Sequence, residues 1–164
     1  MYKNLVLITI FFNTVSLVSA TDCTKQPTPG VDWQRCYLDG KDLEGKDINH
    51  ALLTDASFKR ANLTKANLTK ARGYHAKFIG TIMIEAKLDE SNFQEADFTK
   101  ADLTKASLKN SDLRRAHFFH ANLQGADLSG AKTTGADILT ADLSGATWTD
   151  GKLVCAKGSI GQCN

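Results

Sequence analysis

The feature that most constrains the fold of this 164-residue chain is a five-residue period, which runs without insertion from Cys36 to Cys155. One stretch, residues 61–70, repeats a block outright and reads ANLTKANLTK. The third residue is large and apolar in 22 of the 24 blocks, and the exceptions are Gly73 and Thr133. The first residue is commonly Ala. A register of this length identifies an internal repeat, which decides the architecture before any other signal is considered.

A period of five excludes both an α-helix and a flat strand. On an α-helix five residues advance about 500°, so the apolar residues would form no stable face. On a flat strand an odd period sends successive apolar residues to opposite sides. An apolar stripe therefore requires a bend in every block, and block endings such as Thr-Lys, Ser-Gly and Gln-Gly suit turns. We predict an all-β solenoid with Ala and Leu on the axis and Asp or Asn facing solvent.

These blocks closely resemble those of the pentapeptide repeat family, whose consensus is A(D/N)LXX. Residues 61–65, 101–105 and 126–130 match that consensus outright. The resemblance implies a right-handed quadrilateral β-helix with four blocks in each coil. It also implies about six coils for residues 36–155.

Coils of four blocks sort the axis residues into columns, and one column contains four of the eight Phe residues. Aromatic rings at one coil spacing can stabilise a core beyond simple area burial. In a neighbouring column Gly73 leaves a space, and we expect Phe93 or Phe78 to lean into it. The predicted core stack consists of Phe58, Phe78, Phe98 and Phe118.

The two ends of the chain differ from the repeat. Residues 1–20 combine Lys3, a mostly apolar run and the small residues Val18-Ser19-Ala20, which predict a secretory signal peptide. The alternative is a membrane anchor, but the apolar run is short for a span. We therefore expect a secreted or periplasmic protein without a membrane span after signal removal. The expected parts are a signal peptide at 1–20, an N-terminal cap at 21–35, the β-helix at 36–155 and a C-terminal cap at 156–164.

The four cysteines lie near the two ends of the expected mature chain. An even number of cysteines in an exported protein indicates disulfides, and four cysteines allow three pairings. We expect the local pairs Cys23–Cys36 and Cys155–Cys163, because the long regular middle should hold the two clusters apart. A metal site would need CxxC spacing or nearby histidines, so no metal is expected.

The charge of the chain argues against a nucleic-acid partner. Removal of Lys3 with the signal peptide lowers the formal net charge from +2 to +1. That balance is typical neither of nucleic-acid-binding proteins nor of strongly acidic ones. The best-characterised branch of the family imitates DNA and shields DNA gyrase from quinolones as an acidic cytoplasmic dimer. This chain departs from that branch in charge and in its expected export, so we keep gyrase binding as an alternative.

Histidines and carboxylates fall into columns that repeat every twenty residues. Alternating charges between coils explain the His75 column, and His117 lacks the further ligands that a metal requires. The sequence contains no Ser/His/Asp or Cys/His set and no phosphate loop. We expect no enzyme and no cofactor, and an unrecognised enzyme that uses His75 or His117 is the remaining alternative. The two columns are Asp55, His75, Glu95 and Arg115, and Asp97, His117 and Asp137.

One coil, residues 71–90, interrupts the polar surface with apolar residues at outward positions. Clustered exposed apolar residues mark contact surfaces, whereas single ones are normal on any protein. We therefore expect an exported, non-enzymatic scaffold or protein-interaction module. Its partner is an unknown protein or a second copy that forms a homodimer. The candidate surface consists of Tyr74, Ile79, Ile82 and Ile84, together with Phe119 and Leu139 from the corner column of Ile79.

Overall fold

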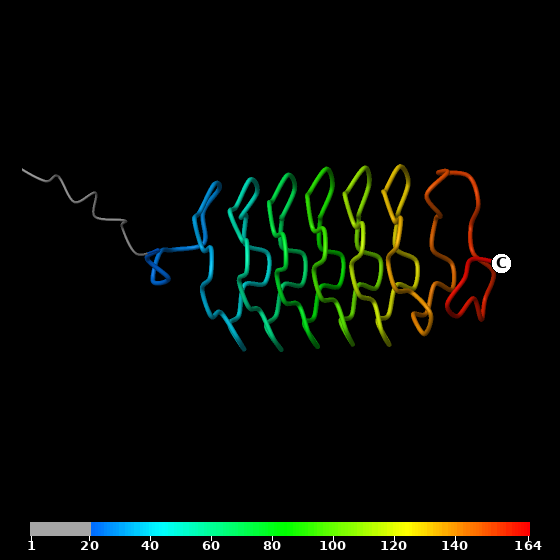
Figure 1. Cartoon of the computed structure of the whole chain (residues 1–164), viewed down its shortest axis with the longest axis horizontal. Coiled ribbons are helices and arrows are strands. Elements are labelled where there is room, and N and C mark those ends of the chain that lie inside the picture. The colour runs from blue at the N-terminus through cyan, green and yellow to red at the C-terminus, as the bar shows by residue number, and fades with distance from the viewer. Residues whose placement is uncertain (1–20) are drawn as a thin grey trace, which may run out of the picture.

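The protein is an elongated solenoid whose coils follow one another from the N-terminal to the C-terminal end (Figure 1). The structure, a computed structural model, describes residues 21–164. The expected signal peptide, residues 1–20, lies outside this range. The backbone of each coil runs roughly across the long axis, so neighbouring coils contact each other along their edges (Figure 1).

The coils pair through single parallel β-bridges rather than through continuous strands. Each bridge joins the second residue of one block to a residue twenty positions later, from Asp32↔Leu52 to Asp127↔Thr147. A turn follows every bridge along this stretch, so residues 21–164 contain no helix and no extended strand. No segment in that range is therefore a helix of the length and apolarity that a membrane span requires. The spacing of the bridges places four blocks in each coil.

The fourth and fifth residues of each block turn the chain through a corner. From Arg35 to Gly145, every fifth residue except Thr140 has a φ between 55° and 74°. A β-branched residue is strongly disfavoured in this left-handed region, which accounts for the exception at Thr140. The Asp or Asn at the second position supports the corner. Its side-chain oxygen accepts a hydrogen bond from the fourth N–H, as between Thr104 N and Asp102 Oδ1 at 3.0 Å.

The axis of the solenoid is filled by the first and third residues of the blocks. Ala at the first position and Leu or Phe at the third are buried through most of the molecule. The four phenylalanines of the predicted stack lie with ring centroids 5.0 to 5.2 Å apart and with planes within 8° of parallel. One aromatic ring per coil therefore forms a continuous column along the axis.

Phe93 occupies the space beside Gly73. A Cβ atom added at Gly73 would lie 2.6 Å from Cδ1 of Phe93. The Phe93 ring also meets two rings of the stack edge-on, with centroid distances of 5.3 Å to Phe78 and 5.8 Å to Phe98. Of the two phenylalanines considered for this space, Phe93 is the one that enters it.

The regular winding begins earlier than Cys36. Val31 and Trp33 are buried, and Asp32 already pairs with Leu52 in the next coil. Residues 31–35 therefore form a block of the first coil, although they were expected in the cap. Their sequence, VDWQR, keeps the apolar third position but lacks the consensus Ala.

The C-terminal segment folds back instead of adding a last regular block. Val154 pairs with Thr147 and Ile160 with Asp142, and both bridges are antiparallel. Leu153 keeps the five-residue register in the sequence, yet it is 42% exposed rather than on the axis. The reversal follows Asp150, whose carboxylate accepts hydrogen bonds from the N–H groups of Lys152 and Leu153, both at 2.9 Å. The C-terminal cap was expected at 156–164, but the chain leaves the regular winding at residue 151, so we call residues 151–164 the C-terminal cap.

Each end of the solenoid contains a disulfide. Cys23 is bonded to Cys36 and Cys155 to Cys163, which are the two local pairings expected. The first bond ties the N-terminal segment to the first coil, and the second closes a loop within the C-terminal cap. Both therefore constrain the ends, where the solenoid has no neighbouring coil on one side.

Candidate interaction surface

Four apolar or aromatic residues form a belt around one coil, and we call Tyr74, Ile79, Ile82 and Ile84 the apolar belt. Tyr74 is 40% and Ile82 43% exposed, whereas Ile79 and Ile84 are half-buried. Tyr74 and Ile79 lie at successive corners, and Ile82 lies on the following side with Ile84 at its corner. The belt therefore bends around the solenoid axis rather than forming one flat patch.

Ile82 interrupts a polar ladder on its side of the solenoid. It pairs with Asn62 in the preceding coil and with Asp102 in the following one. Every other second-position residue of this ladder from Asp42 to Asp142 is Asp or Asn. The fold therefore accepts a polar residue at this position, and Ile82 adds exposed apolar area that the bridge does not require.

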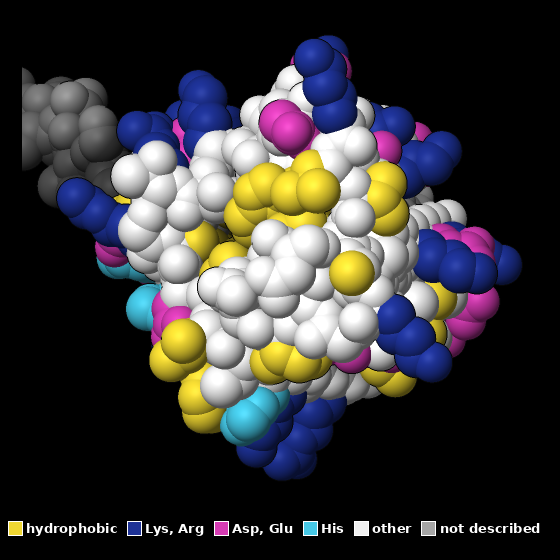
Figure 2. Space-filling view, turned by 90° about the vertical axis from the view of Figure 1, so that its right-hand side faces the viewer, with side chains coloured by type: hydrophobic (Ala, Val, Ile, Leu, Met, Phe, Trp, Pro, Cys, Tyr) yellow, Lys and Arg dark blue, Asp and Glu magenta, His cyan; other side chains and the backbone are white. Residues whose placement is uncertain are grey.

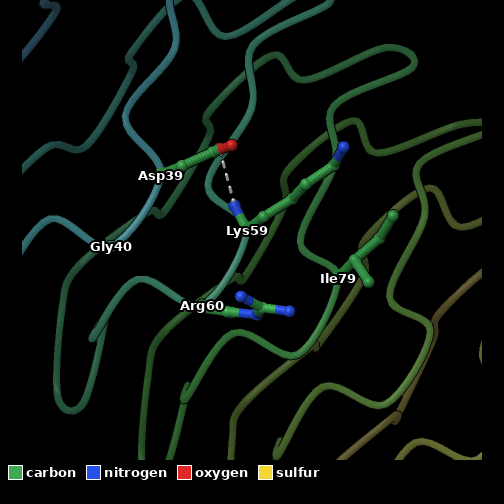
Figure 3. A pocket seen from close by; sticks show the side chains of 5 residues that line it. All are labelled: Asp39, Gly40, Lys59, Arg60 and Ile79. Carbon is green, nitrogen blue, oxygen red and sulfur yellow. Dashed lines mark hydrogen bonds between the residues drawn. The ribbon is translucent and has the colours of Figure 1, made fainter.

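Ile79 borders a hollow of about 550 Å³ on its own corner of the solenoid. Figure 3 shows Ile79, Lys59 and Arg60 around this hollow, with Asp39 at its far side. The Asp39 carboxylate is engaged, because it accepts hydrogen bonds from Lys59 N at 3.0 Å and from Ser57 Oγ at 2.5 Å. The hollow thus offers an apolar wall beside two cationic side chains.

Sequence analysis missed the polar residues of this hollow. A signal existed, because Asp39 and Lys59 belong to the same corner column as Ile79. Column membership alone, however, does not show which side chains leave space between them.

Phe119 and Leu139 extend the corner column of Ile79 toward the C-terminal end. Phe119 is 43% and Leu139 74% exposed. The polar residue Thr99 lies in this column between Ile79 and Phe119. The structure thus places Phe119 and Leu139 on consecutive coils, apart from the belt.

The His75 column is a ladder of polar side chains that contact one another between coils. His75 Nε2 lies 2.7 Å from Glu95 Oε2, and Arg115 Nη1 donates to Glu95 Oε1 at 3.2 Å. On the other side, His75 Nδ1 lies 3.7 Å from Asp55 Oδ1. The hydrogen bond from His75, with further bonds from Arg115 and Tyr74, holds the pKa of Glu95 below its usual value despite partial burial. The geometry is that of hydrogen-bonded and ion-paired side chains that link successive coils.

Tyr74 connects the apolar belt to this ladder. Its ring stacks on the imidazole of His75 with centroids 3.9 Å apart. Partial burial raises the pKa of Tyr74, and the negative charge and hydrogen bond of Glu95 raise it further. The ladder therefore holds one member of the belt in a defined orientation.

His117 lies in a different column from His75. Its backbone forms β-bridges with Asp97 in the preceding coil and with Asp137 in the following one. A shallow hollow of about 390 Å³ separates it from His75. Over residues 21–164, no three or more His, Cys, Asp or Glu side chains are grouped so that they could hold a metal ion.

Comparison with known families identifies the repeat. The sequence profile of the pentapeptide repeats matches residues 42–72, 74–110 and 111–147 in 8 copies. A search of curated proteins found no match.

Several solved structures resemble this one. HetL, a pentapeptide repeat protein involved in heterocyst differentiation regulation in Nostoc sp. strain PCC 7120, is 28% identical, with a TM-score of 0.53 over 75% of this chain and 64% of HetL. QnrB1, a plasmid-mediated fluoroquinolone resistance protein, is 22% identical, with a TM-score of 0.55 over 72% of this chain and 62% of that one. The chain thus spans less than two thirds of either protein.

A pentapeptide repeat protein from the Arabidopsis thaliana thylakoid lumen is 27% identical over 75% of this chain and 83% of its own, with a TM-score of 0.48. The likeness to QnrB1 concerns the fold alone. The repeat profile covers more than half of the chain, and the protein therefore belongs to the pentapeptide repeat family.

Proposed function

We propose that this protein is an exported, non-enzymatic interaction module that contacts a protein partner through the apolar belt. The observation that carries the proposal is Ile82, which is 43% exposed in a ladder where the neighbouring coils have Asn62 and Asp102. Because polar residues satisfy the same bridge positions, stability of the coil does not account for an exposed isoleucine. Clustered exposed apolar side chains are typical of contact surfaces.

The hollow beside Ile79 indicates the chemistry of the partner. Lys59 and Arg60 border it, and the nearby carboxylate of Asp39 is already hydrogen-bonded. A partner surface that combines an apolar side chain with a carboxylate would complement this region. A second copy of the chain and a different protein are both compatible with this chemistry.

Export is supported by two features at the chain ends. Residues 1–20 have the composition of a signal peptide, and both cysteine pairs are disulfide-bonded. Known structures of the family are right-handed quadrilateral β-helices, and we infer that hand and about six coils for this chain.

Gyrase binding is the alternative that the resemblance to the DNA-mimicking branch of the family suggests. The likeness to QnrB1 has 22% identity and supports the fold alone, and the formal net charge of +1 after removal of Lys3 differs from the acidic surface of a DNA mimic. A supercoiling assay with a fluoroquinolone-inhibited gyrase tests it. Protection by the mature protein at a modest molar excess would favour this alternative over our proposal.

The decisive experiment compares the mature protein, residues 21–164, with a belt variant carrying Ile79→Thr, Ile82→Asn and Ile84→Thr. Each replacement is a residue that the same column uses in a neighbouring coil: Thr99, Asn62 and Thr64. The fold should therefore survive. Tyr37→Thr is the matched control, because Tyr37 is 84% exposed and lies outside the belt.

Solution mass from light scattering and capture of proteins from the extracellular or periplasmic fraction are the readouts. We expect an association, with itself or with a captured protein, that the Tyr37→Thr control keeps and the folded belt variant loses. An association that survives in the belt variant, or the absence of any association, would contradict the proposal.

A further inference from the structure

The C-terminal end of the solenoid is covered over only half of its last coil. Residues 141–146 are hydrogen-bonded to the C-terminal cap, with Leu143 N to Ser159 O and Gly145 N to Cys155 O both at 2.8 Å. The two preceding blocks, residues 131–140, pair with the coil before them and have no coil after them, although Gly161 of the cap packs against the Leu139 carbonyl at their last corner. We call residues 131–140 the open edge.

The open edge presents six backbone groups that have no hydrogen-bond partner within residues 21–164. One coil earlier, equivalent donors are paired, as between Leu113 N and Lys132 O at 2.9 Å and between Phe118 N and Asp137 O at 2.7 Å. The open edge therefore repeats the pattern of N–H donors that joins each earlier coil to the next one. The six groups are the N–H of Thr133, Gly135, Ile138 and Thr140 and the C=O of Ala131 and Ala136.

The side chains of this end are suited to contact as well. Thr133 and Ile138, the axis residues of the open edge, are half-buried, and Leu139 beside them is 74% exposed. Figure 2 looks onto this end and shows hydrophobic side chains across it, with Lys and Arg mostly at the periphery. An unpaired edge whose axis residues are only half-buried is a template for a further strand.

We propose that the open edge binds an extended peptide segment of a partner protein by β-strand addition, in the place of two further pentapeptide blocks. The argument is continuity, because the edge has the donors, acceptors and spacing with which each earlier coil binds the next. Main-chain hydrogen bonds would supply affinity, and alternate side chains would supply selectivity. The preferred segment has an apolar residue at the third position of each block, where it covers Thr133 and Ile138.

A second copy stacked in register on this edge is disfavoured by the positions of the caps. At the N-terminal end, residues 23–27 stand over the side of the first coils that carries Lys41, Leu43 and Lys46, and together they line one hollow. The C-terminal cap covers residues 141–147, which occupy the same two sides of the solenoid five coils later. Two copies in register would therefore meet cap against cap, and the open sides would be held apart.

The probe is a fluorescent ten-residue peptide that copies Ser91 to Lys100, SNFQEADFTK, from the same two sides of an earlier coil. The protein is the disulfide-bonded mature chain, residues 21–164, and the readout is fluorescence polarisation. We expect saturable binding, with slower hydrogen exchange at the four free N–H groups. The control peptide is N-methylated at the positions of Asn92 and Asp97, because these N–H groups donate to the preceding coil in the native solenoid. The control should bind at least about tenfold more weakly than the unmodified peptide.

Variants of the protein test the same contact from its other side. Thr133→Pro with Ile138→Pro removes two donors that make no bond in the monomer, and should weaken binding by at least about tenfold. Thr133→Val with Ile138→Val retains both N–H groups and should bind within about twofold of the parent. The N-methylated peptide decides the question if the proline variant does not fold.

Three results would overturn the proposal. The first is that the monomeric parent does not bind the peptide. The second is that the N-methylated peptide binds as tightly as the unmodified one. The third is a dimeric parent whose four amides are protected from exchange without peptide, because a second copy would then fill the edge. The belt variant should bind the peptide as the parent does, so failure here is distinguishable from failure of the proposed function.

Discussion

Gly73 is the one axis residue without a side chain, and Phe93 in the next coil fills the volume that it leaves. In this column the flanking coils have Leu53 and Leu113, and between them a small residue, Gly73, lies next to a large one, Phe93. Packing of this kind couples the two positions, because a side chain at position 73 would overlap the Phe93 ring, and a smaller residue at position 93 would leave a cavity beside Gly73.

The coupling predicts the outcome of a double-mutant cycle. Gly73→Leu alone should lower the free energy of unfolding by about 1–3 kcal/mol, because its side chain would overlap the Phe93 ring. Adding Phe93→Leu should recover most of that loss, with a favourable coupling of about 1–2 kcal/mol. Urea unfolding of the disulfide-bonded protein measures all four species. Strictly additive effects would show that the two residues do not share one space.

A second single-residue effect concerns the left-handed fifth position. Gly125 has a φ of 65°, and a Cβ there would make only an ordinary 3.5 Å contact with Cγ of Lys105. Gly125→Ala should therefore cost about 1 kcal/mol through backbone conformation alone.

Lys105→Ala is the matched control for Gly125→Ala. Lys105 has a φ of 57° and already places a Cβ in the left-handed region, so its replacement by Ala adds no backbone strain. We expect a change within about 0.5 kcal/mol. Equal effects of the two substitutions in urea unfolding would remove conformation as the cause.

At the scale of whole coils, the side-chain ladder around Glu95 helps to fix the register in which neighbouring coils pair at one corner. Glu95 accepts hydrogen bonds from His75 in the preceding coil and from Arg115 in the following one. A shift of one block would separate these partners, so the ladder favours the observed register.

The ladder predicts a pH dependence of stability. Because hydrogen bonds lower the folded pKa of Glu95, its contribution is complete above the usual Glu pKa of about 4.3 and is lost as the pH falls through the lowered value. Glu95→Gln should therefore be less stable than the parent at pH 7, and the gap should close toward about pH 3. Urea midpoints across this range test the expectation, with Glu85→Gln as the control. A gap that does not change with pH would contradict it.

Across the whole molecule, stability should be local, because each coil contacts only its neighbours. The two disulfides constrain the ends, where one side of the solenoid has no following coil. The ends should therefore open without unfolding of the middle.

Removal of the C-terminal disulfide should destabilise the C-terminal end without destabilising the middle of the solenoid. Cys155→Ser with Cys163→Ser removes a bond of sequence separation 8, which corresponds to about 2–3 kcal/mol of local stability. Hydrogen exchange at Leu143 N and Gly145 N should accelerate by up to about 100-fold, while Phe78 N in the middle should change little. The same change at Cys23 and Cys36 should leave the C-terminal amides as they are. Uniform acceleration along the chain would indicate global unfolding instead.

Much of this architecture was accessible from the sequence. The five-residue period required a solenoid, and the local cysteine pairs followed from the length of the middle. The column of Phe58, Phe78, Phe98 and Phe118 followed once the family resemblance supplied four blocks per coil. These features depend on spacing along the chain, which a sequence displays directly. The belt residues were also identified from their outward positions.

Other features could not be found in this way. Leu153 continues the period but leaves the axis, because Asp150 and Gly151 reverse the chain there. The hollow beside Ile79 depends on where the Lys59 and Arg60 side chains extend, which block position does not specify.

The sequence by itself determined the solenoid, its period and most of its axis, because every block repeats the same local choice of buried and turning residues. Only the tertiary structure decided which edges stay unpaired. Residues 131–140 follow the same pattern as other blocks, and their free N–H groups result from where a distant segment, residues 151–164, folds back. Pairing between coils is a long-range property, so the open edge and its proposed partner became visible only in three dimensions.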